Sequence, residues 1–165
     1  MGTQFASVYN RFLDKITDDM YMELTPEDTI RDLQNLLINA IPGFEFPRIT
    51  LGYEILTRPI NENSFNKEGF LITDVDGNGY EDASEFHNLL TSEEINILAI
   101  LMMNDWLQRQ ITSIENIRMK YGGTDFKMTS QAAHLAKLLS LLEETQRQSI
   151  HMQRLYKRRR TDDNG

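Results

Sequence analysis

The segment from Asp74 to Glu85 has the residue types and the spacing of a calcium-binding loop. In the EF-hand pattern, oxygen ligands stand at alternate positions, a glutamate closes the loop, and a glycine in the middle allows the sharp bend. This arrangement suits a hard divalent cation, which takes about six to eight oxygen ligands. The predicted ligands are the side chains of Asp74, Asp76, Asn78, Asp82 and Glu85 and the backbone carbonyl of Tyr80.

Two features of this segment depart from an EF-hand. Glu81 stands where an apolar residue normally pairs with a second loop, and the preceding residues NKEGFLIT have a strand pattern in place of the entering helix. Asn78-Gly79 is also a strong tight-turn pair. The sequence therefore leaves two interpretations open, a calcium loop outside an EF-hand fold and an acidic hairpin tip.

A basic cluster near the end of the chain is a second candidate site. It could contact phosphates or dock on an acidic protein surface. Alternatively, it is a solvated helix end, where the helix dipole stabilises positive charges at the C-terminus. The acidic body and the lack of interleaved aromatic residues disfavour nucleic-acid binding. We predict that this cluster binds a protein partner through Arg154, Tyr156, Lys157, Arg158, Arg159 and Arg160.

The sequence gives little support to catalysis. His87, His134 and His151 lie far apart and lack metal-ligand spacing, and the chain has no phosphate-binding glycine loop or nucleophile elbow. We therefore predict a protein that is not an enzyme and requires no cofactor, with calcium as the single ion that the sequence suggests. Phe126 and Met128 are apolar residues in an expected loop, so we predict that they contact another subunit.

The charge of the chain is unevenly distributed along its 165 residues. Residues 1–105 contain 6 basic and 19 acidic residues, a net charge of −13, whereas residues 106–165 contain 11 and 6, a net charge of +5. The absence of cysteine excludes disulfides and thiolate metal sites. No signal peptide or long apolar run is present, so we expect a protein outside the membrane, made in the cytoplasm.

Helical periodicity predicts the elements that position these sites. One helix is expected from Phe5 to Ile16, and a second follows the cap residue Thr25 until Pro42-Gly43. Between them and the later helices, residues 48–56 and 70–72 are expected to form a β-hairpin.

Two long helices are expected in the second half of the chain. Thr91 opens a capping box for a helix that reaches Tyr121, and the last helix runs from Gln131 to about Tyr156. The leucine-rich start of that last helix is expected to face the core, and the polar part after Leu142 to project beyond it.

The predicted fold is therefore mainly α, a helical bundle with a long antiparallel helical hairpin, a small β-hairpin and an extended basic C-terminal arm. The expected division is a helical domain over residues 1–145, with the β-hairpin and acidic loop inserted at 44–90, and the arm at 146–165.

Four stretches covering about two thirds of the chain resemble head–tail connector (adaptor, or head-completion) proteins of tailed bacteriophages. The resemblance lies in the order of the helices and in the basic ending. The Asp74–Glu85 loop lies outside it. The stretches are NRFLDKITDDMY, TPEDTIRDLQNLLINAIPGFEFPR, LTSEEINILAILMMNDWLQRQI and the end from GGTDFKMTSQAAHLAKLL to RLYKRR.

The resemblance implies a structural virion protein in the neck, between capsid and tail. It implies a ring of copies, with the portal's twelve-fold symmetry, that extends the DNA channel and contacts the portal and other neck proteins. The basic arm would engage the portal, and DNA would pass through the lumen without sequence-specific binding. Alternatives are a stopper or tail terminator, a calcium-binding interaction module using residues 74–85, and a nucleic-acid-binding helical protein.

Overall fold

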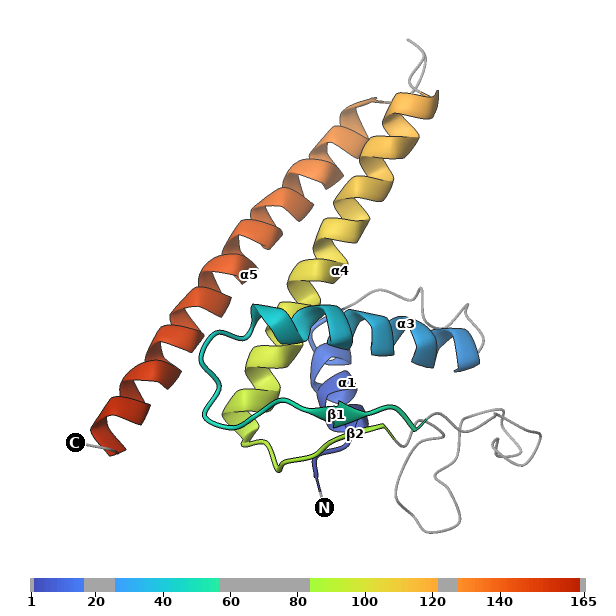
Figure 1. The fold of residues 1–165 in the computed structure, drawn as a ribbon. Coiled ribbons are helices and arrows are strands. Elements are labelled where there is room, and N and C mark those ends of the chain that lie inside the picture. Colours follow the sequence, from blue (N-terminus) through green and yellow to red (C-terminus); the bar gives the residue numbers. More distant parts are fainter. Residues whose placement is uncertain (1, 17–25, 57–83, 122–127, 164–165) are drawn as a thin grey trace.

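The computed structural model describes residues 2–16, 26–56, 84–121 and 128–163, and their side chains over 2–16, 28–56, 84–116 and 133–159 (Figure 1). The described residues are mainly helical with a small two-stranded sheet, which confirms the predicted fold class. Helix α4 lies at the centre: α1 and α3 pack against one side of it and α5 against another. Within the described residues, no helix has both the length and the apolar character needed to cross a membrane.

Helices α1 (Phe5–Leu13) and α3 (Pro26–Ala40) each place one apolar face against α4. Helix α1 ends three residues before the predicted Ile16, because the backbone closes into a turn at Asp14 and Lys15. Helix α3 ends as predicted, in a 3-10 turn (Ile41–Gly43) that contains Pro42. The buried residues of these two helices are Phe5, Ala6, Val8, Tyr9, Phe12, Ile30, Leu33, Leu36, Leu37 and Ala40.

The small sheet pairs β1 (Tyr53–Glu54) with β2 (Glu85–Phe86) in antiparallel register. Gln4 forms an additional bridge to Glu85, so the start of the chain lies beside β2. The predicted return strand at 70–72 lies outside the described residues. Glu85 was expected to end an acidic loop, and the structure instead places it in a strand.

Helix α4 (Ser92–Tyr121) begins with the predicted capping box. The Glu94 backbone N–H donates to the Thr91 hydroxyl oxygen at 3.2 Å, and the Thr91 N–H donates to Glu94 Oε1 at 2.9 Å. Each residue thus satisfies a donor that the first turn of a helix leaves without a partner.

Helix α5 (Met128–Asp163) buries side chains of its C-terminal half, which was predicted to project beyond the core. Thr145, Ser149 and Tyr156 are buried, whereas Leu139 is 44% and Leu141 40% exposed. The physical reason is the helix face: Leu139 and Leu141 lie beside the stripe that faces α4, whereas Leu135 and Leu138, which lie on that stripe, are partly buried against the core. Some of the described side chains from residue 146 to Arg159 are therefore buried, and the predicted division into a domain and an arm stays a prediction.

We expect Thr91→Ala to lower the free energy of unfolding by about 1 kcal/mol, because the helix loses its N-cap acceptor. Thr112→Ala is the matched control, since its hydroxyl donates back to Gln108 O within the same helix and caps nothing. Urea denaturation of the two variants measures the difference. Equal losses in both would contradict a role for the capping box.

Candidate functional site

The charged and polar residues at the end of α5 meet the body around Tyr156, which is 1% exposed. Its hydroxyl donates to Glu94 Oε2 at 3.0 Å and accepts the Arg48 backbone N–H at 2.8 Å. Glu94 is itself only 2% exposed, and its other oxygen is occupied by the capping box. One carboxylate therefore joins the start of α4 to the end of α5.

The loop after α3 wraps against the same part of α5. Phe44 contacts Tyr156 edge-on with ring centroids 5.4 Å apart, and the Arg48 guanidinium lies 4.7 Å from the Tyr156 ring centroid. Gln153 accepts from the Glu45 N–H at 2.7 Å and donates to the Gly43 carbonyl at 3.2 Å. The loop and α4 thus hold α5 from two directions.

The environment of Tyr156 favours its neutral phenol. Burial raises the pKa of Tyr156, and the hydrogen bond and charge of Glu94 raise it further, while the contacts with Arg48 act in the opposite direction. A neutral phenol retains the proton that it donates to Glu94. The contact is therefore present throughout the neutral range.

The structure divides the predicted basic cluster between the core, internal contacts and solvent. Tyr156 was predicted to bind a partner, but its side chain is buried in this protein's own core. Lys157 Nζ lies 4.4 Å from the Phe46 ring centroid, and Arg159 forms an ion pair with Glu93 at 3.0 Å. Arg154 and Arg158 are exposed on the outer side of α5. The Arg160 side chain lies outside those described.

Sequence reasoning missed Glu94, Arg48 and Gln153 as the residues that fix the end of α5. The spacing of alternating three and four residues along α5 could have indicated its buried face, because that spacing keeps side chains on one helical stripe. The stripe consists of Leu142, Thr145, Ser149, Met152 and Tyr156, all buried or partly buried.

Five of the six predicted calcium ligands lie outside the described residues, so the calcium site stays a prediction. Asp74, Asp76, Asn78, Tyr80 and Asp82 lie outside them, and Glu85 lies in β2 opposite Glu54. The part of the chain that the structure describes contains no group of three histidine or acidic residues arranged to hold a metal. Among the predicted partner residues, Phe126 lies outside the described part and Met128 is the first residue of α5.

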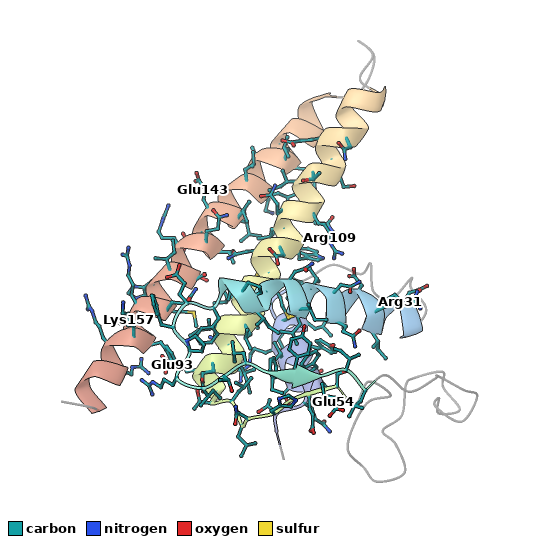
Figure 2. All side chains as sticks on the ribbon, in the orientation of Figure 1. Arg31, Glu54, Glu93, Arg109, Glu143 and Lys157 are labelled. Atoms are coloured by element: carbon teal, nitrogen blue, oxygen red, sulfur yellow. The ribbon has the colours of Figure 1, made fainter. Side chains whose placement is uncertain are left out.

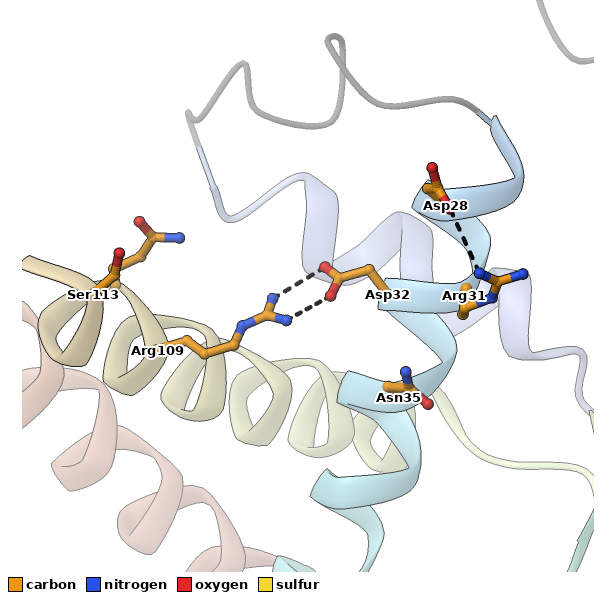
Figure 3. Close-up of a pocket in the computed structure, with 7 residues that line it drawn as sticks. Asp28, Arg31, Asp32, Asn35, Arg109 and Ser113 are labelled. Atoms are coloured by element: carbon orange, nitrogen blue, oxygen red, sulfur yellow. Dashed lines mark hydrogen bonds and ion pairs between the residues drawn. The ribbon is translucent and has the colours of Figure 1, made fainter. Parts of the chain in front are cut away.

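A polar groove of about 500 Å³ lies between α3 and α4 (Figure 3). Arg109 crosses it and donates to both carboxylate oxygens of Asp32, while Arg31 pairs with Asp28 at 3.7 Å. Beside it, burial raises the pKa of Asp105, and the positive charge of Arg109 partly offsets this effect. The two-bonded Arg109–Asp32 contact connects the helices, so we assign the groove a structural role.

No model of a known protein family matches this chain, and no curated protein or solved structure matches it.

We expect Tyr156→Phe to lower the free energy of unfolding by roughly 1–3 kcal/mol, because buried Glu94 Oε2 and the Arg48 N–H lose their partner. The raised pKa adds a pH dependence. The phenol's contribution is complete below its unfolded pKa of about 10 and is lost as pH rises through the higher folded value.

Chemical denaturation of wild type and Tyr156→Phe across neutral and alkaline pH measures both effects. The stability gap between the two proteins should shrink above about pH 10. Tyr53→Phe is the control for the loss of a tyrosine hydroxyl elsewhere in the fold. A gap for Tyr156→Phe that stays constant would contradict the assignment of the neutral phenol.

Proposed function

We propose that this chain is a structural virion protein, a head–tail connector subunit of a tailed bacteriophage. The four stretches that resemble such proteins support the proposal, and the single structural observation that carries it is the projecting end of the α4–α5 hairpin. We call this part the hairpin tip, residues 112–116 of α4 and 133–141 of α5. It extends past the layer formed by α1 and α3 (Figure 1).

The hairpin tip has the surface of an element that another protein covers. Leu139 and Leu141 are each more than a third exposed, and Leu135 and Leu138 are only partly buried. Burying apolar surface contributes about 25 cal/mol of favourable free energy per Å². The exposed surface of these leucines makes no such contribution while it faces water. A partner seated on the tip recovers it, and this is the use expected of an exposed apolar patch.

In this proposal the protein has a scaffolding role in the virion neck and no catalytic activity. Copies form a ring below the portal, and the hairpin tip contacts the portal or the next neck protein. The net charge of −8 suits a wall along which DNA moves, since an acidic surface repels phosphates. DNA would then pass through the lumen of the ring without sequence-specific binding.

The proposal is tested by mixing the purified protein with the portal protein of the same virion and imaging the complex by electron microscopy. We expect a ring of density attached to the portal. Leu139→Asp combined with Leu141→Asp should reduce its occupancy at least tenfold, because charges would enter an apolar contact.

Ile150→Asp is the control, since Ile150 is an apolar residue of α5 outside the hairpin tip and is 51% exposed. It should leave portal binding unchanged. A wild-type protein that shows no affinity for the portal would overturn the proposed function. Equal loss in the control and in the tip variant would overturn the role of the tip.

A further inference from the structure

The outer face of α5 carries a row of basic side chains that the packing of the helix does not use. Arg147, His151, Arg154 and Arg158 follow one another at steps of three or four residues, which places them on one face over about 16 Å. All four are exposed, and their face is opposite the one that buries Ser149 and Tyr156. We call these four residues the basic stripe.

Two arginines of the basic stripe are available for an intermolecular contact. Arg147 lies 3.4 Å from Glu144, an exposed pair that contributes little. No described residue forms an ion pair with Arg154 or Arg158. Neighbouring Lys157 and Arg159 turn toward the body, which leaves the outward direction to these two arginines.

The sheet presents the opposite charge. Glu54 and Glu85 stand directly opposite each other in the antiparallel register, so their side chains share one face, whereas Tyr53 and Phe86 pack on the other. Like charges in this arrangement destabilise a sheet. No described cation pairs with either glutamate. We call Glu54 and Glu85 the acidic pair.

The basic stripe and the acidic pair lie on different sides of the molecule. Helix α5 packs on α4, and α4 separates it from α1 and α3. Figure 2 shows Lys157 of α5 at one side of the body and Glu54 of β1 well apart from it, on the sheet. Surfaces of opposite charge on different sides cannot meet within one chain, but they can meet between successive copies.

We propose that the basic stripe of one copy docks on the acidic pair of the next copy, in a head-to-tail contact. This inference rests on the proposed ring and names the surfaces that build it. Residues four apart on a helix have Cβ atoms about 5–6 Å apart, and opposite residues of a strand pair about 4.5–5.5 Å. Arg154 and Arg158 can therefore meet Glu54 and Glu85 one to one, each arginine binding a carboxylate through two hydrogen bonds.

A second copy fits the basic stripe better than nucleic acid does. Exposed Glu143 and Glu144 stand at the start of the same helical segment, and the chain as a whole has a net charge of −8. These two carboxylates and the net negative charge all repel a phosphate backbone. The same negative charge makes the body of another copy a suitable partner, since the positive surface then relieves the repulsion within the acidic pair.

Charge reversal tests this contact with the protein alone. We expect wild type to self-associate at low ionic strength and to dissociate at about 1 M salt, where the Debye length is only about 3 Å. R154E/R158E and E54R/E85R should each be monomeric, because each presents two surfaces of the same sign. An equimolar mixture of the two variants should associate again, measured by sedimentation velocity.

Single substitutions guard against a change in folding. R158E and E54R should each weaken association at least tenfold, while K137E and E115R, the same charge changes at exposed sites of α5 and α4, should not. Thermal melting checks that all variants fold. A wild-type chain that stays monomeric at low salt, or a mixture that fails to associate, overturns the inference.

The outcome is separable from that of the proposed function. Rings on the portal that tolerate R154E/R158E would retain the connector role and refute this contact. Restored association of the mixed variants without portal binding would retain the contact and refute the connector role.

Discussion

The arrangement of this protein depends on the single carboxylate of Glu94. A buried carboxylate is costly unless hydrogen bonds satisfy both oxygens. Here one oxygen accepts the Thr91 N–H and completes the helix cap, and the other accepts the Tyr156 hydroxyl proton. The same group therefore defines where α4 begins and where α5 docks, so a local signal and a tertiary contact are satisfied together.

This contact explains why the two ends of the hairpin differ. At the end near Tyr156, hydrogen bonds and aromatic contacts fix α5 on the body, and little apolar surface is needed. At the hairpin tip, Leu135 and Leu138 are partly buried, and Leu139 and Leu141 remain exposed beside them. A hairpin held by polar contacts at one end can thus present its apolar end to another protein.

The sequence was sufficient for features set by neighbouring residues. The Thr91 capping box, the turn at Pro42 and the mainly helical class all followed from short-range patterns. The buried side chains of α5 could not be predicted from hydrophobicity alone, because Leu139 is more apolar than Ser149 but lies off the helix face that packs on α4. Tyr156 was misplaced for a similar reason: its arginine neighbours suggest a surface, while its partners Glu94 and Arg48 are distant in sequence. Five of the six calcium-loop residues lie outside the described part, so that prediction stays a prediction.

The fold also determines on which surfaces the opposite charges of the sequence lie. Net charges of −13 and +5 say nothing about whether the two signs face each other or face apart. The packing of α5 on α4 turns the basic stripe away from the acidic pair, so within the described residues the two surfaces do not neutralise each other. A head-to-tail contact of this kind leaves unmatched surfaces at the ends of every open chain of copies, and only closure into a ring removes them. Closure and charge complementarity therefore favour the same assembly. Salt should weaken the contacts between copies far more than the apolar contact at the hairpin tip.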